Sequence, residues 1–387
     1  MKKALMFASV ASMIEQFNMQ NIRILISLGY QVEVACNFDY GSSTTQAKVK
    51  NLKKNLKDMN VKMYNIQIPR NITSIKNLKK SYDSTKKIID QNKYEIIHCH
   101  SPIGGVIARL AAKNQRSKGT SVVYTAHGFH FYKGAPLLNW LLYYPVEKLL
   151  SRFTDILLTI NKEDYYRAKR KFHSRSIKYI PGVGVNTQAY LNSDVDKKVK
   201  FKELNIPGDP FIVLSVGELN ENKNHKTIIK AISQIENDNV YYIICGIGSL
   251  RDNLLNLSKK LGIQDRVILL GYREDIKDIY HISDIFAFPS RREGLGLAAL
   301  EAMASSLPIV TSNVHGITDY SVNTVTGLTC DPNNTQQFKE ALIKLITDEN
   351  LRNKIQENNN KIVKKYDIQV VNEKMYSIYK DLKYDSI

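Results

Sequence analysis

The stretch from Phe286 to Val310, FAFPSRREGLGLAALEAMASSLPIV, constrains the fold more than any other part of the chain. It begins with a short apolar run that ends at Pro289 and is typical of a buried strand. Gly294 and Gly296 interrupt the pattern, and apolar residues at helical spacing follow until a Leu-Pro pair closes the helix. The stretch therefore predicts a strand, a glycine turn, a helix and a second strand.

Two carboxylates flank this turn, Glu293 before the helix and Glu301 about two turns into it. A glycine turn that opens a helix offers backbone amides and the positive end of the helix dipole, which together suit a phosphate. The turn lacks the Lys and Ser/Thr of a P-loop, and GLG is too short for the dinucleotide fingerprint. Because carboxylates repel phosphate, we expect them to accept hydrogen bonds from the hydroxyls of a nucleotide sugar. A helix with one capping and one solvated glutamate explains the same spacing.

Strand-like and helix-like runs alternate through the first half of the chain. Strands are predicted over 4–8, 32–36, 95–99 and 121–125, and helices over 13–28, 48–58, 75–90 and 103–112. This order predicts a doubly wound parallel sheet, in which ligands lie at the carboxyl ends of the strands. Three histidines fall there: His98, His100 and His127.

The second half restarts the pattern, with strands predicted over 211–216, 241–245, 267–270 and 284–288. A polar stretch at 191–209 ends in Pro-Gly-Asp-Pro and indicates an interdomain region. We therefore predict an N-terminal domain over 1–190 and a C-terminal domain over 191–367. The final helix, in 368–387, is expected to pack back on the first domain.

Length and cysteine use agree with this organisation. A chain of 387 residues suits two domains. The four cysteines are far apart without a CxxC, which indicates buried thiols in a reducing compartment. The start, MKKALMFASVASMI, is similar to a signal peptide, but its apolar residues merge into the helical pattern of 13–28. No apolar run has the length of a membrane span, so we expect a cytoplasmic protein.

Charge is divided unequally between the halves. Residues 1–190 hold 30 Lys and Arg against 11 Asp and Glu, whereas residues 191–387 hold 25 against 26. A basic half suits nucleic acid, anionic lipid or an anionic substrate, and a lysine-rich solvated surface is the alternative. Because no basic stripe is interleaved with aromatics and no recognition module is present, we expect no nucleic-acid partner.

Residues 129–150 are rich in aromatics and leucine, and Pro136 suits a helix start. The simpler interpretation is a helix buried between the sheet and its neighbours. The alternative is docking at a lipid interface, where Tyr and Trp beside lysines are favoured. A basic run, RAKRK, follows at 167–171.

The motif Glu293-Gly294-Leu295-Gly296 followed by Glu301 resembles the EGFG-x4-E signature of retaining glycosyltransferases of family 4. The resemblance covers nearly the whole chain and is closest to the branch that builds capsular and exopolysaccharide repeat units. It implies the α/β GT-B fold, two Rossmann-like doubly wound parallel-sheet domains facing across a cleft. Leu295 stands where the family more often has Phe.

The resemblance also implies roles in donor binding. Glu293 would face the donor sugar, Glu301 would hold the ribose, and the amides from Gly294 to Leu297 would meet the diphosphate. Lys223, in a loop beginning at Gly217 that resembles the GR-L-x3-KG element, would hold the diphosphate as well. Gly246 and Gly248 match the family's GxGP-L element and are further candidates for donor binding. Arg273, which precedes the segment that reads the nucleotide base in the family, is another. Glu218 stands where the family has Arg; candidates to replace it are Arg251, Arg273, Arg291 and Arg292.

In the first domain, His127 matches the histidine that contacts the donor sugar or orients the acceptor. His100 is a further candidate for acceptor binding. The first strand-to-helix loop has Ser9 and Ser12 in place of the family's Gly pair, and it would serve the acceptor.

The implied activity is transfer of a sugar, with retention, from a nucleotide diphosphate sugar (a UDP-sugar by family habit) to an acceptor hydroxyl. No cofactor or metal is expected, because Lys223 and the helix amides neutralise the leaving group and no DxD ends a strand. The expected acceptor is a sugar. The basic first half favours a lipid-diphosphate-linked sugar at the anionic inner membrane surface. A sugar-nucleotide epimerase of the same fold and an inactive sugar-nucleotide-binding protein are the alternatives.

Overall fold

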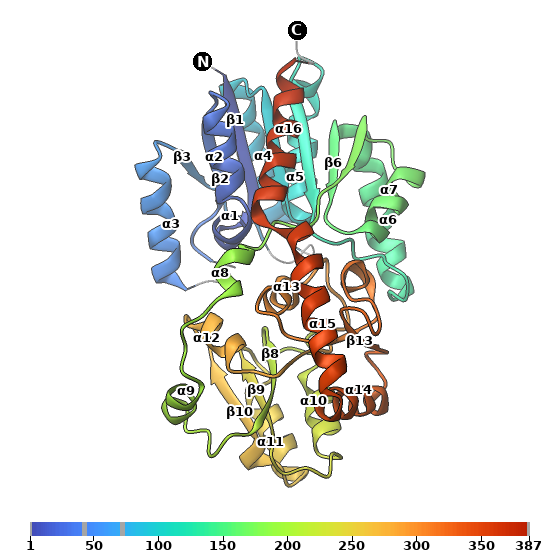
Figure 1. Ribbon diagram of the computed structural model, residues 1–387. Coiled ribbons are helices and arrows are strands. Elements are labelled where there is room, and N and C mark those ends of the chain that lie inside the picture. The colour runs from blue at the N-terminus through green and yellow to red at the C-terminus, as the bar shows by residue number, and fades with distance from the viewer. Residues whose placement is uncertain (1, 41–44, 70–73, 385–387) are drawn as a thin grey trace. The chain divides into compact units, whose positions relative to one another are not determined.

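The computed structural model describes residues 2–40, 45–69 and 74–384. The chain divides into two compact units. Unit 1 comprises Met1–Val183 and Gln369–Ile387, and unit 2 comprises Gly184–Ile368. Within these described ranges each unit is built on one parallel sheet covered by helices (Figure 1).

Unit 1 has a seven-stranded sheet in the order β3-β2-β1-β4-β5-β6-β7, and all of its neighbouring strands run parallel. The strands are β1 (Lys3–Val10), β2 (Gln31–Asn37), β3 (Lys62–Asn65), β4 (Ile96–His100), β5 (Ser121–Ala126), β6 (Ile156–Thr159) and β7 (Ser176–Tyr179). The helices are α1 (Ala11–Phe17), α2 (Met19–Ser27), α3 (Gln46–Asp58), α4 (Ile75–Asn92), α5 (Pro102–Arg116), α6 (Leu137–Leu150), α7 (Lys162–Lys171) and α16 (Ile368–Tyr384). The sequence pattern did not indicate β6 and β7.

Unit 2 has a six-stranded parallel sheet in the order β10-β9-β8-β11-β12-β13. Its strands are β8 (Phe211–Val216), β9 (Val240–Cys245), β10 (Val267–Gly271), β11 (Ile285–Phe288), β12 (Ile309–Ser312) and β13 (Gly327–Cys330). Its helices are α8 (Thr187–Leu191), α9 (Lys197–Glu203), α10 (His225–Ile232), α11 (Arg251–Lys260), α12 (Ile276–His281), α13 (Leu297–Ala304), α14 (Thr335–Thr347) and α15 (Glu349–Ile362). The predicted pair of doubly wound α/β units is confirmed.

The central strands are buried on both faces. Every residue from Ala4 to Ala8 has no exposed surface, and the same holds for Ile285 to Ala287. Helices on both sides of a parallel sheet require such continuous apolar strands, because no face is left for water. All four cysteines lie in this buried part and are unpaired, as the sequence indicates.

Each sheet reverses its strand order at one point, between β1 and β4 in unit 1 and between β8 and β11 in unit 2. Chain connections leave in opposite directions there, so a crevice opens beyond the carboxyl ends of these strands. The fold therefore predicts the ligand-binding loops after β1, β4, β8 and β11.

The helix predicted over 13–28 is wrong in one respect, because two helices, α1 and α2, meet at Asn18. Asn18 is fully buried, and its side-chain amide donates to the carbonyl of Met13 at 2.8 Å. Asparagine breaks a helix in this way because its side chain competes for backbone hydrogen bonds. The apolar period continues across the break, which explains why the sequence pattern does not reveal it.

The prediction that residues 129–150 form a buried helix is also wrong. Helix α6 buries only Glu147 and Leu150, while most of its leucines are exposed. The inward side of the helix carries other residues. The carboxylate of Glu147 forms a buried ion pair with Arg109, 2.9 Å away, and the rings of Trp140, Tyr143 and Tyr144 pack against the core, so the leucines face outward.

Candidate functional site

The loops after β8 and β11 form the centre of the site in unit 2. The backbone amide of Arg291 donates to the carbonyl of Asn222 at 2.8 Å, and the side-chain Nδ2 of Asn222 donates to the carbonyl of Arg292 at 2.9 Å. The side chain of Asn224 also donates to the carbonyl of Pro289, at 3.1 Å. These bonds fix the loop that carries Lys223 against the loop that carries Glu293.

Lys223 and Glu293 form an ion pair at the switch point of the sheet. Nζ of Lys223 donates to Oε1 of Glu293 at 2.6 Å, and the side chains are 20% and 14% exposed. The ammonium also lies 4.9 Å from the centre of the Phe288 ring, which adds a cation–π contact. Two residues that the sequence places 70 positions apart are thus brought together.

The glycine turn leads directly into α13. Gly296 precedes the helix with a φ of 91°, and a Cβ there would come 2.6 Å from the Phe288 ring. Only glycine combines this left-handed conformation with such a close approach. The first amides of α13 have no partner within the helix. Leu295 is 2% exposed, so its contribution to a ligand is confined to its backbone.

Glu301 lies on α13, where two tyrosines surround its carboxylate. Tyr280 donates to Glu301 Oε2 at 3.1 Å, and Tyr190 of α8 provides a second hydrogen bond. Burial raises the pKa of Glu301, and the two hydroxyls oppose that rise. A carboxylate held in this way can accept hydrogen bonds from vicinal hydroxyls such as those of a ribose. Neither tyrosine belongs to a motif that the sequence pattern could identify.

The predicted glycines act by letting backbones approach. A Cβ on Gly246 would lie 1.9 Å from the carbonyl oxygen of Gly217, and one on Gly248 would lie 2.4 Å from that of Leu219. A Cβ on Gly217 would meet the Lys223 side chain at 3.1 Å. These glycines therefore pack the loops after β8 and β9 together beneath Lys223.

Arg273 is engaged elsewhere in unit 2. Its Nε donates to Asp275 at 2.7 Å, and Nη2 donates to Glu203 of α9 at 3.0 Å. Lys200 completes this cluster at 2.6 Å from Asp275. The structure does not join Arg273 to the Lys223–Glu293 pair.

Of the candidates to replace the family's arginine at Glu218, two lie beside Glu293 in the loop after β11, namely Arg291 and Arg292. The Arg291 guanidinium reaches Asn333 at 2.8 Å. Arg251 is on the exposed start of α11 and pairs with Asp252. Glu218 itself is exposed.

Three histidines gather at the ends of β4 and β5 in unit 1. The rings of His98 and His100 are 4.1 Å apart, and Nδ1 of His100 shares a hydrogen bond with Nε2 of His127 at 3.1 Å. His98 bonds the Thr125 hydroxyl at 2.8 Å and the hydroxyl of Tyr379 on α16 at 2.5 Å.

Burial lowers the pKa of all three rings, to about 3 for His98 and about 4 for His127, and well below the usual value for His100. The rings are therefore neutral near pH 7 and offer hydrogen bonds in place of charge. Nε2 of His100 is buried and has no hydrogen-bond partner within the described ranges. It is available to a ligand hydroxyl.

Ser9 joins the end of β1 to the start of α5. Its hydroxyl lies 2.6 Å from that of Ser101 and accepts from the amide of Gly104 at 2.9 Å. A Cβ on Gly104 would lie 3.0 Å from the backbone nitrogen of Ser9. The family's first loop has a glycine pair that allows two backbones to approach closely; here the glycine that allows this approach is Gly104, on α5. Ser12 is buried at 4% exposure. The Ser9 hydroxyl thus holds the loop in place.

Two units, each built on a doubly wound parallel sheet, define the GT-B class of fold. Residues 196–362 match the profile of the "Glycosyl transferases group 1" family, and residues 8–161 match "Glycosyl transferase 4-like". The chain is 38% identical over 320 residues to EpsD of Bacillus subtilis, named as a glycosyltransferase, with 81% of this chain and 80% of EpsD covered. This protein therefore belongs to glycosyltransferase family 4, and it is a glycosyltransferase.

A second relative and a solved structure add detail. The chain is 31% identical over 322 residues to an Escherichia coli enzyme named UDP-Gal:α-D-GlcNAc-diphosphoundecaprenol α-1,3-galactosyltransferase, covering 81% of this chain and 82% of that one. The Anabaena protein HepE, solved in complex with UDP and glucose, superposes with a TM-score of 0.77 at 19% identity, over 98% of this chain and 100% of HepE. At that identity the likeness supports the fold.

Proposed function

We propose that this glycosyltransferase moves a sugar from a UDP-sugar to a hydroxyl of a lipid-diphosphate-linked sugar, with retention at the anomeric carbon, in the synthesis of a bacterial surface polysaccharide. The observation that carries the proposal is the Lys223–Glu293 pair beside the glycine turn of α13. One cation, one carboxylate and a helix N-terminus stand together, as a sugar diphosphate requires. The names of the E. coli relative and of the HepE complex support the donor and acceptor classes.

The chemistry assigns each group a separate task. Lys223 and the first amides of α13 stabilise the negative charge that develops on the departing diphosphate. Glu293 holds hydroxyls of the donor sugar, and Glu301 with its two tyrosines holds the ribose. No metal is required for this charge balance.

Retention then follows from a same-face reaction. The departing phosphate accepts the proton of the acceptor hydroxyl while that oxygen bonds the anomeric carbon. His127 and His100 are neutral, so they orient the acceptor through hydrogen bonds. Exclusion of water limits hydrolysis of the donor.

Thermal shift and released nucleotide across a panel of nucleotide sugars test the donor assignment. We expect one UDP-sugar to raise the Tm of the wild type, and Lys223→Ala to abolish that rise. Lys230→Ala is the matched control, since Lys230 is an exposed lysine of α10 in the same unit. No response to any nucleotide sugar would refute the donor site.

Two rival activities make different predictions. An epimerase of this fold would convert the nucleotide sugar without any acceptor. An inactive binding protein would keep its ligand-induced Tm rise, while Glu293→Gln would change no reaction. Mass spectrometry of the sugar nucleotide with and without acceptor separates all three.

A further inference from the structure

Helix α6 presents a continuous apolar face to solvent. Its exposed side chains range from 42% exposure for Val146 to 81% for Leu137. At 100° per residue they fall on one side of the helix together with Pro145. They are Leu137, Leu138, Leu141, Leu142, Val146 and Leu149. Soluble proteins rarely leave so many neighbouring leucines uncovered, and a patch of this kind indicates a surface that something covers.

The orientation of α6 is fixed by its inner side. The buried Glu147 carboxylate pairs with Arg109 at 2.9 Å and accepts from the Tyr124 hydroxyl at 3.1 Å. Further along, Tyr144 packs edge-on against Phe131 with ring centres 5.3 Å apart. Turning the leucines inward would break a buried ion pair and leave the Arg109 guanidinium buried without its partner, which is strongly destabilising. The outward leucines are therefore a fixed feature.

Basic residues flank this face. Residues 130–175 hold nine Lys and Arg against four Asp and Glu. The four acids are engaged: Glu147 with Arg109, Asp155 with Arg116, and both Glu163 and Asp164 with Arg167. On α7 and just beyond it, the exposed cations are Lys162, Lys169, Arg170, Lys171 and Arg175.

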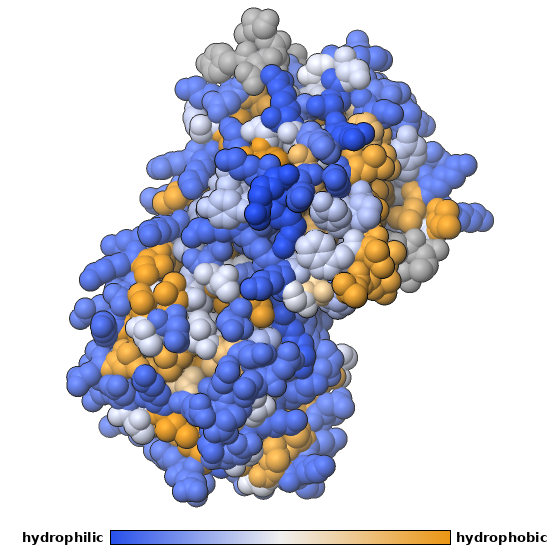
Figure 2. All heavy atoms as spheres, turned by 90° about the vertical axis from the view of Figure 1, so that its right-hand side faces the viewer, coloured by the Kyte–Doolittle hydropathy of each residue, from blue (hydrophilic) through white to orange (hydrophobic). Residues whose placement is uncertain are grey.

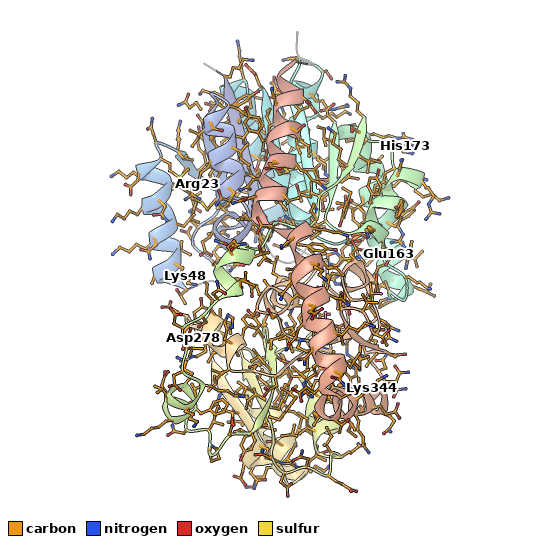
Figure 3. All side chains as sticks on the ribbon, viewed as in Figure 1. Arg23, Lys48, Glu163, His173, Asp278 and Lys344 are labelled. Atoms are coloured by element: carbon orange, nitrogen blue, oxygen red, sulfur yellow. The ribbon has the colours of Figure 1, made fainter. Side chains whose placement is uncertain are left out.

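The figures place these features on one side of unit 1. Figure 2 turns that side toward the viewer, and hydrophobic side chains gather on it among hydrophilic ones. In Figure 3, Glu163 and His173 lie on this side with α7, whereas Arg23 and Lys48 lie on the opposite side with α2 and α3. A cation–π contact connects α6 to α7, since the Arg167 guanidinium lies 4.9 Å from the centre of the Trp140 ring.

We propose that α6 is a membrane-docking helix that lies in the interface of an anionic bilayer, with its leucines among the acyl chains and the cations of α7 at the lipid headgroups. Within the described residues no helix has the length and apolar character to cross a bilayer. A helix of 14 residues with one apolar side instead suits an orientation parallel to the membrane plane. The flanking positive charge favours anionic lipid over a second copy of this basic chain, which it would repel.

This inference deepens the proposed function and rests on it in one respect, the lipid-linked acceptor. When the acceptor is anchored in a bilayer, an enzyme bound to the same surface reaches it by diffusion in the plane of the membrane. The inference names α6 as the element that holds unit 1 there. Its physical test does not require sugar transfer.

Vesicle binding tests the inference, and a tryptophan on the apolar face reports how that face inserts. Trp140, the only tryptophan of the chain, lies on the inward side of α6 against Phe131, so Leu142→Trp in a Trp140→Phe background supplies the reporter. The full chain is mixed with phosphatidylcholine vesicles that contain or lack phosphatidylglycerol, and binding is measured by flotation. We expect binding to the anionic vesicles that weakens with salt. We also expect brominated acyl chains to quench the fluorescence of the tryptophan introduced on the apolar face.

The apolar contribution is tested with Leu138→Gln/Leu141→Gln/Leu149→Gln, which should weaken binding more than about a hundredfold. The matched control, Ile75→Gln/Val199→Gln, changes two similarly exposed apolar residues on α4 and α9 and should leave binding unchanged. Unchanged far-ultraviolet dichroism and Tm show that the variants fold.

The charge contribution is tested with Lys169→Gln/Arg170→Gln on α7. Each cation near an anionic surface is worth about a fivefold change in affinity, so the loss of two should weaken binding about twenty-five-fold. The same change on the opposite side of unit 1, Lys53→Gln/Lys54→Gln on α3, should have a much smaller effect.

Two results would overturn the inference. One is equal vesicle binding by the leucine variant, together with no quenching of the tryptophan introduced on the apolar face. The other is no vesicle binding together with a dimer, seen by sedimentation, that the leucine variant loses; α6 would then be an interface between copies. If vesicle binding persists while no sugar acceptor is used, the proposed function fails and this inference stands.

Discussion

Replacing Glu293 by Gln should tighten the binding of UDP while it slows sugar transfer. In the free protein Nζ of Lys223 lies 2.6 Å from Oε1 of Glu293, and both side chains are mostly buried. A diphosphate that binds Lys223 must displace this carboxylate and also face its negative charge. The amide of Gln keeps the shape of the side chain and removes the charge, so both penalties fall.

The size of the effect follows from the geometry. At an effective dielectric constant of about 20 a contact pair attracts by about 4 kcal/mol, and desolvation and side-chain entropy leave a net of roughly 1 kcal/mol. The Kd for UDP should therefore fall about fivefold. Loss of a charge-assisted hydrogen bond to the donor sugar, about 1.5–3 kcal/mol, should lower kcat/KM by at least about tenfold.

Calorimetric titration with UDP and initial rates with the UDP-sugar measure the two effects separately. Glu218→Gln is the control, because it removes one exposed carboxylate of unit 2 and leaves the Lys223–Glu293 pair in place. Weaker UDP binding in Glu293→Gln would refute the reasoning. An equal gain in UDP affinity in Glu218→Gln would show that the effect comes from the net charge of unit 2 and not from the Lys223–Glu293 pair.

Three other changes probe both units. Because burial holds the pKa values of His98 and His127 below their unfolded values, the unfolded chain takes up protons first as the pH falls. The free energy of unfolding should therefore drop by about 2 kcal/mol for each ring between about pH 7 and about pH 5. Urea unfolding at a series of pH values should show a flatter profile for His98→Gln. Glu147→Ala should destabilise by about 3–5 kcal/mol in urea unfolding, whereas Arg109→Met/Glu147→Leu should recover most of that loss. Gly246→Ala places a Cβ 1.9 Å from a carbonyl oxygen and should lower the unfolding free energy by about 1–3 kcal/mol, seen as a lower Tm, with weaker nucleotide binding.

The sequence alone determined the features that short-range pattern controls. Alternating strands and helices identified two doubly wound sheets, because a strand covered on both faces must be continuously apolar. The Glu293 motif located the loop before α13, because a left-handed turn at Gly296 needs glycine. These signals lie within a few residues of each other, so no long-range contact is needed to detect them.

Only the tertiary structure decided the contacts between distant residues. It brought Lys223 to Glu293 across 70 positions, and His98 to Tyr379 across 281 positions. It also left the leucines of α6 exposed to solvent, because the opposite side of the helix carries Glu147, whose partner is an arginine on another helix. A helical pattern shows which residues share a face, and the charges buried elsewhere in the fold decide which face meets the solvent.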